Sequence, residues 1–381
     1  MMEKFLITFY LEAPLTMYGG GEKIAIDLCN HIRMKGYAAE IVDNIRDDVK
    51  IRVSESYTTK VCNCPVRRGE FINSGFLSKI YQPMPTFKEI KSFERLAIIF
   101  IRRIPPTRYL TEIDKNRVKT IFALHGIALE KIRFGHPLII AHQILIRLQL
   151  IRLAHMVNKN LVVQSLTENV TEYLIKHGAP RNRVVTIGNG IESVKYKVGR
   201  NDDIFTITFI GRIENLQKGI KRLLSIARIL YVKEPKIQFE IIGTGKDDSL
   251  LRHVPPNVNV LGFVDEKSKL NSFEKANLLV ITSNLEPFSI VAIEGLFSGI
   301  PIVSTPVSGP MQIISSDSEF GKLITFSPKD IARILYEYYL IWNSGKKEYF
   351  DAKIRRSNKA KKLFDKSLML ESYEKLIQII T

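Results

Sequence analysis

Short runs of apolar residues alternate along the chain with longer segments whose apolar residues recur at helical spacing. The first run, residues 4–10 (KFLITFY), is rich in β-branched and aromatic residues and is therefore predicted to be a strand. A turn-rich loop follows it, and residues 24–36 then show helical spacing and end at Gly36. Because AAEIVD (38–43) predicts the next strand, the beginning of the chain is expected to form a βαβ unit.

The same alternation continues through the rest of the chain. Residues 165–178 have a Ser/Thr-rich start and a glycine stop, which predicts a helix. The pattern therefore predicts an α/β fold with mostly parallel sheets in two halves, joined near the polar residues 192–204. Further strands are predicted at residues 118–126, 158–165, 183–191, 205–212, 236–245, 258–264, 276–283 and 299–309.

Length and composition agree with a globular chain of two domains. The chain has 381 residues, of which 45% are hydrophobic and 25% charged. No run of about 18 apolar residues is free of charge, so no transmembrane helix is predicted, and the first ten residues are interpreted as a strand, not a signal peptide. The three cysteines, Cys29, Cys62 and Cys64, are too few for a disulfide framework or a zinc site and fit the reducing cytoplasm.

The chain is strongly basic. Lys and Arg total 56, Asp and Glu total 39, and the net charge is +17. Such an excess suits nucleic acid, an anionic membrane or phosphorylated substrates, and it also fits an ordinary solvated surface. Nucleic acid is not the expected partner, because the charge is dispersed and no basic module with interleaved aromatic residues is present.

The loop after the first predicted strand has the composition of an anion-binding loop. Gly19, Gly20 and Gly21 precede a helix that is predicted to start near Glu22. Glycines allow close approach of a backbone to a ligand, and a helix start adds partial positive charge. A tight turn would use the same residues, but the position between a strand and a helix favours ligand contact.

Two further loops at strand ends have residues that suit a diphosphate. In the first, Gly211 and Arg212 end a predicted strand, and Lys218 precedes the next helix; Arg offers a planar fork of donors and Lys a compact charge. In the second, residues 304–310 (STPVSGP) offer hydroxyl groups and amides beside a predicted helix start. A diphosphate bound by such hydroxyls and amides would need no metal ion. A solvated basic turn and an ordinary capped turn are the alternatives.

Two glutamates eight positions apart flank an apolar segment, EPFSIVAIEG. A helix is predicted to begin at Ser289 as its N-cap, so that Glu286 precedes the helix and Glu294 lies in its second turn. Both are expected to face one cleft, where each carboxylate can accept hydrogen bonds from a sugar ring. The alternative is that Glu286 favours the helix dipole and Glu294 is a surface residue.

Taken together, these motifs resemble the retaining glycosyltransferases of family 4. The most specific part is the E-x7-E pattern with G-x-P and a strand after it, placed downstream of GR…KG, and the similarity extends from about residue 4 to residue 315. It implies the GT-B fold, two Rossmann-like domains with parallel sheets that face each other across a cleft. The segments that carry it are GGGEK (19–23), VQSLTENVTEYLIKHGAP (163–180), IGNGI (187–191), FIGRIENLQKGI (209–220), EIIGTG (240–245), EPFSIVAIEGLFSGIPIVST (286–305) and SGP (308–310).

The resemblance implies a domain division and a role for each matched residue. Residues 1–192 would bind the acceptor and residues 193–361 the nucleotide sugar, while a final helix, 362–381, would pack back on the first domain. The implied catalytic residues are His125 near the anomeric carbon, Arg212 and Lys218 at the diphosphate, and Glu286 at the donor sugar, with Glu294 binding the ribose. The implied donor-binding residues are Gly19, Gly20, Gly21, Gly211, Arg212, Lys218, Glu286, Phe288, Ser289, Ile290, Glu294, Ser308 and Gly309.

Three positions depart from the family pattern. Ser289 stands where the family often has glycine, Met311–Gln312 stand where an acid is usual, and His125 is followed by Gly126 in place of an acidic neighbour. These departures concern the donor's identity and the role of His125. A purely structural role would fit this histidine equally well.

The implied reaction moves a sugar, with retention, from a UDP- or GDP-sugar to a glycan or a lipid-linked acceptor, with no metal or other cofactor. Another nucleotide-sugar enzyme of the GT-B type, an epimerase or a sugar-phosphate synthase, is the alternative, but no acid–base pair for it is evident. A nucleic-acid-binding protein is the remaining alternative.

Two basic apolar stretches favour a protein that is cytoplasmic and bound peripherally to an anionic membrane. They are residues 88–109 and 131–159, which include Arg102, Arg103 and Arg147 among long apolar runs. Buried helices whose arginines reach the surface would give the same pattern.

Overall fold

The computed structural model describes most of the chain, in two compact units. The N-terminal unit comprises residues 1–189 and 369–381, and the C-terminal unit comprises residues 190–368. The described residues are 6–11, 20–43, 65–68, 71–72, 84–86, 95–101, 103–132 and 136–380.

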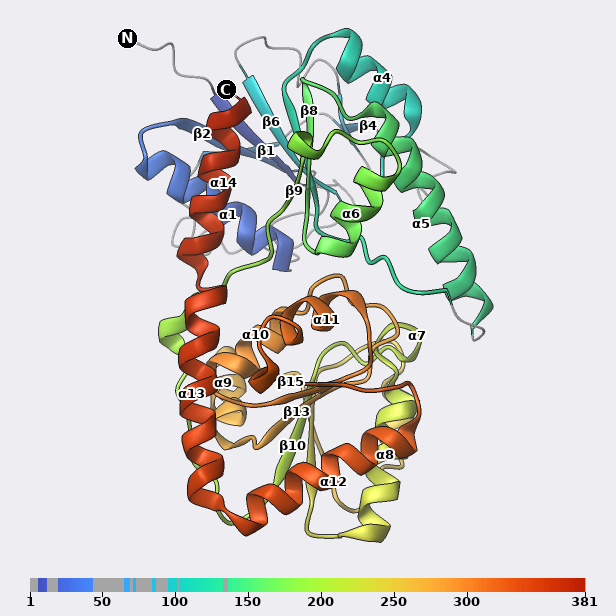
Figure 1. The fold of residues 1–381 in the computed structure, drawn as a ribbon, viewed down its shortest axis with the longest axis vertical. Helices are drawn as coiled ribbons and strands as arrows, with labels where there is room; N and C mark the ends of the chain where they lie inside the picture. The colour runs from blue at the N-terminus through green and yellow to red at the C-terminus, as the bar shows by residue number, and fades with distance from the viewer. Residues whose placement is uncertain are drawn as a thin grey trace. The chain divides into compact units, whose positions relative to one another are not determined.

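The N-terminal unit is built on a seven-stranded sheet in which every strand pair is parallel (Figure 1). Its order is β3-β2-β1-β6-β7-β8-β9, so the chain starts in the middle of the sheet and fills first one side and then the other. A short antiparallel pair, β4 (Phe71–Ile72) and β5 (Met84–Pro85), lies outside this sheet. The seven strands are β1 (Leu6–Leu11), β2 (Ala38–Asp43), β3 (Val66–Arg68), β6 (Arg95–Ile101), β7 (Thr120–Leu124), β8 (Leu161–Ser165) and β9 (Val184–Thr186).

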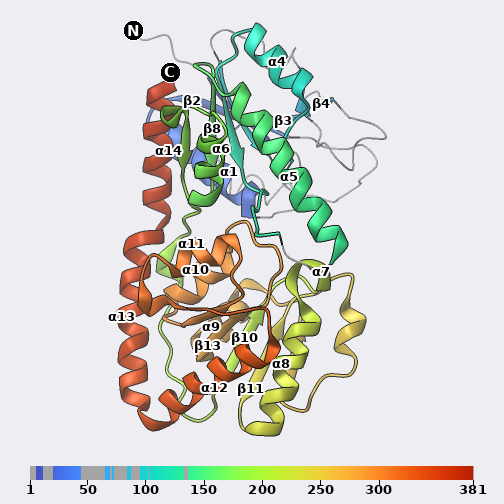
Figure 2. The ribbon, with the colours of Figure 1, turned by 45° about the vertical axis from the view of Figure 1, so that its right-hand side comes forward.

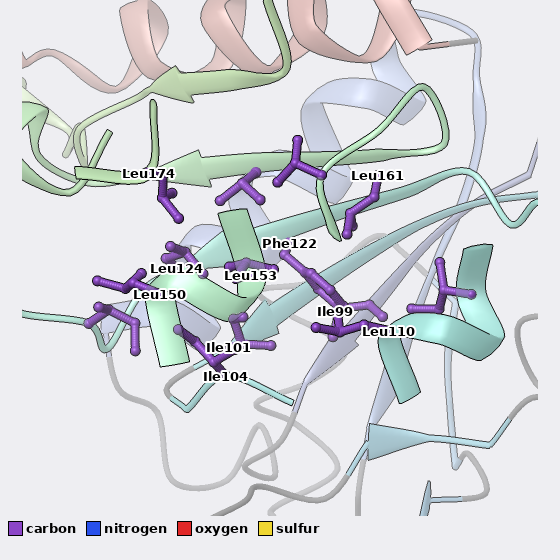
Figure 3. Close-up of a cluster of buried hydrophobic side chains, with 14 of the residues drawn as sticks. Ile99, Ile101, Ile104, Leu110, Phe122, Leu124, Leu150, Leu153, Leu161 and Leu174 are labelled. Carbon is purple, nitrogen blue, oxygen red and sulfur yellow. The ribbon is translucent and has the colours of Figure 1, made fainter. Parts of the chain in front are cut away.

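Helices cover both faces of this sheet. Apolar residues of α1 and α14 form one buried cluster with strand residues such as Ile7 and Phe9, and residues of α4, α5 and α6 form a second cluster on the opposite face. Figure 3 shows the second cluster, in which Leu150 and Leu153 of α5 lie among side chains of the central strands. The helices are α1 (Gly20–Met34), α4 (Thr107–Lys115), α5 (Pro137–Met156), α6 (Glu168–Lys176) and α14 (Lys366–Ile380).

The C-terminal unit has a six-stranded parallel sheet in the order β12-β11-β10-β13-β14-β15. Counted along the chain, this is the order 3-2-1-4-5-6 of Rossmann folds, in which ligands bind where the strand order reverses, here between β10 and β13. The strands are β10 (Thr206–Ile210), β11 (Gln238–Ile242), β12 (Val258–Gly262), β13 (Leu278–Ile281), β14 (Ile302–Ser304) and β15 (Gly321–Leu323).

Seven helices and a few 3-10 turns complete the described part of this unit. Residues of α8 and α12 pack together on one face of the sheet in a single apolar cluster (Figure 2). The helices are α7 (Asn215–Lys218), α8 (Ile220–Lys233), α9 (Glu266–Lys275), α10 (Ile290–Phe297), α11 (Ser308–Ile314), α12 (Pro328–Ser344) and α13 (Lys346–Phe364). The 3-10 turns of the described chain are η3 (Arg181–Arg183), η4 (Ser193–Lys195), η5 (Asp248–Leu251) and η6 (Ser318–Phe320).

The division between the units follows the hydrogen bonds at the two chain crossings. The amide of Ile191 donates to the carbonyl of Phe364, and the amide of Lys366 donates to the carbonyl of Ile191. The hydroxyl of Ser193 also donates to Asp365, 2.5 Å away. These bonds hold residues 190–193 and 364–368 together, so the structure divides the chain at 189/190 and 368/369, close to residues 192 and 361 where the sequence placed the boundaries.

The C-terminal end of the chain contains two helices, where the sequence predicted one over residues 362–381. A break at Asp365 separates α13 from α14. Buried cations hold α13 on the C-terminal unit: Lys353 donates to the carbonyls of Gly199 and Ala276, and Arg356 donates to the carbonyl of Gly299. From Met369 onward, α14 belongs to the N-terminal unit.

Three local expectations differ in detail or in kind from the structure. Residues 95–101, within a stretch interpreted as a membrane-binding or buried helix, form strand β6 beside β1, and its residues from Leu96 to Ile101 are buried. The helix after the glycine loop begins at Gly20, not near Glu22, so Gly20 and Gly21 lie in its first turn and only Gly19 falls outside the described residues. Cys29, buried in α1, is disulfide-bonded, which differs from the reducing environment that the cysteine count favoured; its partner lies outside the described residues.

Candidate active site

The candidate site of the C-terminal unit is formed by loops at the carboxyl ends of three adjacent strands. Parallel strands β10, β13 and β14 are neighbours, so the loops that follow them meet at one edge of the sheet. Residues 211–219 follow β10, residues 282–289 follow β13, and residues 305–310 follow β14. This edge is the topological switch point, where open parallel sheets bind their ligands.

A partly buried ion pair joins the first two loops. The Nζ atom of Lys218 lies 2.5 Å from Oε2 of Glu286, and the two side chains are 17% and 10% exposed. The hydroxyl of Ser283 also donates to Oε2, at 3.2 Å. The structure therefore brings together two residues that the sequence assigned to neighbouring parts of one ligand, and it adds Ser283 to them.

Backbone packing fixes the position of Lys218. Gly219, directly after it, has φ +69°, and a Cβ atom there would lie 2.2 Å from the carbonyl oxygen of Thr282. The hydroxyl of Thr282 donates to the carbonyl of Lys218 at 2.8 Å, and the amide of Asn284 donates to Gln217 at 2.7 Å. Only glycine fits at position 219, since any side chain would separate the loops after β10 and β13.

An arginine that the sequence analysis did not select holds the same two loops from the side of α8. Arg222 donates to the carbonyl of Thr282 at 2.5 Å and to the side chain of Asn284 at 2.9 Å. Its third bond, from Nε, reaches the carbonyl of Phe326 at 3.0 Å. Its position shortly after Lys218 and Gly219, in the first turn of α8, was the available signal.

The loops after β13 and β14 also approach closely. The amide of Gly309 donates to the carbonyl of Glu286 at 2.8 Å, and a Cβ atom on Gly309 would lie 2.2 Å from the carbonyl oxygen of Phe288. Gly211 and Gly243 meet in the same way, since a Cβ on Gly243 would lie 2.0 Å from the carbonyl oxygen of Gly211. Glycine at positions 309 and 243 is therefore a packing requirement of the site, whereas a Cβ on Gly211 would meet no atom closer than 3.6 Å.

Ser289 occupies the N-cap position of α10 but does not act as the predicted cap. Its backbone is left-handed, with φ 80° and ψ 78°, and its side chain makes no capping hydrogen bond. The residue is buried, and Ile290 begins the helix directly after it. This backbone conformation favours glycine, which gives a physical reason for the glycine that the family often has here.

Arg212 lies in the loop after β10, and its side chain bonds to residues of that same loop, not to the loop after β13. Its guanidinium donates to Oε1 of Gln217 at 2.5 Å and lies 3.5 Å from Oε2 of Glu214, and its side chain is 66% exposed. The structure records no bond between Arg212 and Glu286. Of the two cations assigned to the diphosphate, only Lys218 is held against Glu286.

Glu294 has a different set of partners from Glu286. Its Oε1 atom accepts hydrogen bonds from the hydroxyl of Tyr196 at 2.8 Å and from Lys269 at 2.7 Å. Burial and the charge of Glu294 raise the pKa of Tyr196 well above its ordinary value, so this hydroxyl stays protonated as a donor. Within the described residues, both of these bonds go to Oε1, and Oε2 of Glu294 accepts none. Tyr196 and Lys269 are partners that the sequence analysis missed, because they are distant in the chain.

The hydroxyl groups of the loop after β14 are used differently from the prediction. Ser304 donates to the carbonyl of Thr305 at 2.8 Å, and Thr305 donates to the carbonyl of Ser283 at 2.5 Å. These two hydroxyls therefore stabilise the loops instead of facing a ligand. Ser308 and Gly309 begin the seven-residue helix α11 and are both buried.

In the N-terminal unit, His125 directly follows β7. Its Nε2 atom lies 3.1 Å from the hydroxyl of Tyr373 in α14, and its ring lies 4.7 Å from the ring of Phe100, centroid to centroid. Its amide donates to the carbonyl of Ile101 at 3.0 Å. Gly20 and Gly21 lie at the start of α1, which follows β1, and strand β6 lies between β1 and β7 in the sheet.

Among the residues that the structure describes, no group of three or more His, Cys, Asp or Glu side chains is arranged to hold a metal ion. The described charged groups on or beside the loops at the switch point include Lys218, Arg212, Arg222, Glu214 and Glu286.

The C-terminal unit carries a family signature. Residues 191–346 match the profile of the family described as glycosyl transferases group 1. The chain is 30% identical over 219 residues to an uncharacterised glycosyltransferase of Methanocaldococcus jannaschii, covering 50% of this chain and 54% of that protein. It is 25% identical over 156 residues to a phosphatidyl-myo-inositol mannosyltransferase of Mycobacterium tuberculosis, covering 39% of this chain and 41% of that protein. The chain thus spans about half the length of the curated relatives it matches.

The fold resembles solved structures over almost the whole chain. HepE of Anabaena, crystallised with UDP, superposes with a TM-score of 0.71 at 16% identity, covering 98% of this chain and 99% of that one. A sucrose-phosphate synthase of Thermosynechococcus elongatus gives a TM-score of 0.73 at 15% identity, covering 98% of each chain. Two Rossmann-like units on parallel sheets confirm the predicted GT-B fold class, and residues 191–346 match the glycosyl transferases group 1.

Proposed function

We propose that the protein is a retaining glycosyltransferase that moves a sugar from a UDP- or GDP-sugar to a glycan or a lipid-linked acceptor. The observation that carries this proposal is the ion pair of Lys218 and Glu286 at the switch point of the sheet that matches the group 1 profile. A cation for a diphosphate and a carboxylate for sugar hydroxyls lie side by side there. HepE has been crystallised with UDP and with UDP-glucose, which supports a nucleotide sugar as the donor.

Donor binding would replace the internal partner of Lys218. Without donor, the ammonium group of Lys218 is neutralised by Glu286. A diphosphate that accepts hydrogen bonds from Lys218 leaves Glu286 to accept them from the sugar, with Ser283 retained as its second donor. Glu294, whose Oε2 keeps acceptor capacity, is assigned to the ribose.

The chemistry is electrostatic. As the bond between the anomeric carbon and the diphosphate breaks, negative charge develops on the leaving phosphate, where Lys218 and Arg212 stabilise it. One such preorganised donor is worth roughly 3–4 kcal/mol of transition-state stabilisation. The acceptor hydroxyl attacks from the leaving-group face and gives its proton to the departing phosphate. His125 hydrogen-bonds the sugar near the anomeric carbon, and no divalent metal is required.

Calorimetric titration with UDP, GDP and duplex DNA, followed by a mass-spectrometric screen of nucleotide sugars for hydrolysis, tests the proposal. We expect binding of one nucleoside diphosphate and slow hydrolysis of its sugar in the absence of acceptor. Binding of DNA with no nucleotide binding would contradict the proposal. Conversion of the sugar without release of the diphosphate would point to an epimerase instead.

We further propose that α5 docks this cytoplasmic enzyme on an anionic membrane that presents the acceptor. α5 is the one helix of the described chain that is long and apolar enough, by length and composition, to cross a membrane. Its inner face is packed in the core through Leu150 and Leu153, so the helix is part of the N-terminal unit. Its outer face exposes Leu138, Ile144, Leu145 and Leu148, with Leu138 64% exposed.

Charge complementarity supports an anionic lipid surface as the proposed occupant of this face. No Asp or Glu occurs between Glu130 and Glu168, and the exposed Lys131 precedes the helix by six residues. Partial burial lowers the pKa of His142 in α5, and the nearby charge of Arg103 lowers it further. A helix with an apolar outer face and basic flanks binds at the interface of anionic bilayers.

Co-sedimentation with vesicles tests this docking surface. The double variant Leu138→Gln, Leu145→Gln should lose binding to vesicles that contain anionic lipid, while Val232→Gln, which alters an exposed apolar residue of α8, should not. Equal binding of all proteins to anionic and neutral vesicles would contradict the proposal. A shift of the wild type to dimers that the double variant abolishes, with no vesicle binding, would assign the face to a second copy of the chain.

A further inference from the structure

We propose that Tyr373 of α14 is a positioning residue for His125, whose ring it fixes as the neutral tautomer with the proton on Nδ1. The tautomer assignment stands on geometry alone, whereas its consequence for catalysis rests on the proposed role of His125 in sugar transfer. The two residues are separated by 248 positions in the chain and belong to the same unit.

The contact lies at the edge of the buried core. Tyr373 is 1% exposed and belongs to the apolar cluster that α14 forms with α1 and strand β1. The hydroxyl oxygen lies 3.1 Å from Nε2 of His125, which is partly buried at the carboxyl end of β7. The phenol therefore extends through the core with its polar end at His125.

Burial decides which atom donates. The phenol of Tyr373 has one hydrogen-bond partner in the described part of the chain, the Nε2 atom of His125. If the imidazole donated through Nε2, the hydroxyl hydrogen would be buried without an acceptor, which proteins avoid. If the hydroxyl donates, both atoms are satisfied. Nε2 then carries no hydrogen, and in the neutral ring the proton is on Nδ1.

The hydroxyl stays protonated and is therefore able to donate whenever the imidazole is neutral. Burial raises the pKa of Tyr373 far above its ordinary value, so the phenol does not ionise under conditions in which the protein is folded. Tautomer and ring orientation are therefore set by the partner of one ring nitrogen, as for histidines in other polar sites.

Two further contacts restrict the ring. Phe100 of β6 lies against it with an interplanar angle of 49°, and the amide of His125 is tied to the carbonyl of Ile101 on the same strand. A ring held by an aromatic neighbour, a backbone bond and a directed hydrogen bond presents Nδ1–H in one direction. A neutral N–H donor of this kind suits a sugar oxygen and is less suited to removing a proton.

The tautomer is tested directly by nitrogen-15 NMR of the full-length protein labelled in histidine, at a pH where the ring is neutral. The signals of His125 are assigned by their loss in His125→Gln. We expect Nδ1 to give the shift of a protonated ring nitrogen and Nε2 that of an unprotonated one. A protonated Nε2 with unprotonated Nδ1 in the wild-type protein would overturn the inference.

Tyr373→Phe removes the hydrogen bond and keeps the ring in the core. We expect the His125 signals to shift toward a mixture of tautomers and kcat to fall about tenfold, with the KM for donor changed much less. Tyr349→Phe is the matched control, because this buried tyrosine of α13 donates to the carbonyl of Asn277, in the other unit. Unchanged His125 signals in Tyr373→Phe would contradict the inference.

Failure of the proposed function is distinguishable from failure of this inference. If His125→Gln leaves sugar transfer unchanged, the catalytic role of His125 is wrong, while the NMR result still decides the tautomer. If Tyr373→Phe unfolds the protein, the wild-type spectrum alone decides the assignment.

Discussion

The two units of the molecule share an architecture but differ in how their candidate sites are made. In the C-terminal unit, three loops are joined to one another by backbone hydrogen bonds and glycine contacts, with Lys218 and Glu286 paired among them. In the N-terminal unit, one candidate side chain, His125, is held by a tyrosine from the far end of the chain. The family profile covers the first of these units and not the second.

This difference fits the two tasks proposed for the units. A nucleoside diphosphate is the same ligand in many enzymes, so a rigid set of loops with fixed glycines suits it. An acceptor differs from one enzyme to the next, and its unit carries the features that no shared pattern predicts, such as the exposed face of α5 and the contact of Tyr373 with His125.

The largest expected effect comes from removing the charge at the centre of the rigid site. Lys218→Ala should lower kcat about 100- to 1,000-fold, because one preorganised donor to the leaving phosphate is lost. Lys221→Ala is the control, since Lys221 is exposed on α8 three positions further on. Steady-state transfer assays and thermal unfolding of both variants make the measurement. Equal turnover of Lys218→Ala and wild type would show that the diphosphate is bound elsewhere.

A smaller effect is expected from separating the loops of the same site. Gly309→Ala places a methyl group against the carbonyl of Phe288 and should lower the free energy of unfolding by about 1–3 kcal/mol, with loss of nucleotide binding. Gly36→Ala, in the N-terminal unit, meets no atom within 4 Å but has φ +88°, so it should cost only about 1 kcal/mol of backbone strain. Denaturant titration compares the two, and nucleotide affinity that survives in Gly309→Ala would contradict the rigid-site interpretation.

The smallest expected effect is a stabilisation of the fold. Ser289→Gly relieves a left-handed backbone and should raise the free energy of unfolding by about 1 kcal/mol. If the hydroxyl of Ser289 contacts the donor, the same variant should weaken donor-sugar binding while UDP or GDP binding is kept. A destabilised Ser289→Gly, measured by thermal unfolding, would show that the serine side chain supports the fold.

The sequence predicted the site loops and five of the six strands of the C-terminal unit, because most of these strands are short buried apolar runs followed by a glycine or serine loop. It missed β15 (Gly321–Leu323), which is short and is not buried. It predicted roles for Lys218 and Glu286, and the structure adds their direct pairing. It misjudged the hydroxyls of Ser304 and Thr305, which donate to nearby carbonyls. Composition places a hydroxyl in a loop but does not say whether a backbone acceptor lies closer than a ligand.

Other features depend on distant partners and were not predictable. Strand β6 was missed because its apolar run is flanked by charged residues, and only its place between β1 and β7 makes it a buried strand. Arg212 has the residue type of a phosphate ligand, but Gln217 and Glu214 determine where its guanidinium lies. The contact of Tyr373 with His125 joins two residues of one unit that are 248 positions apart in the chain, and no sequence periodicity relates them.

Hydrogen–deuterium exchange of the full-length protein with and without UDP, and with and without GDP, tests the central claim most directly. The site proposed here predicts that one of the two nucleotides slows exchange in peptides covering residues 211–219 and 282–290, and leaves residues 137–148 of α5 unchanged. Slower exchange confined to other segments, with residues 211–219 and 282–290 unaffected by a nucleotide that binds, would contradict the claim that Lys218 and Glu286 mark the donor site.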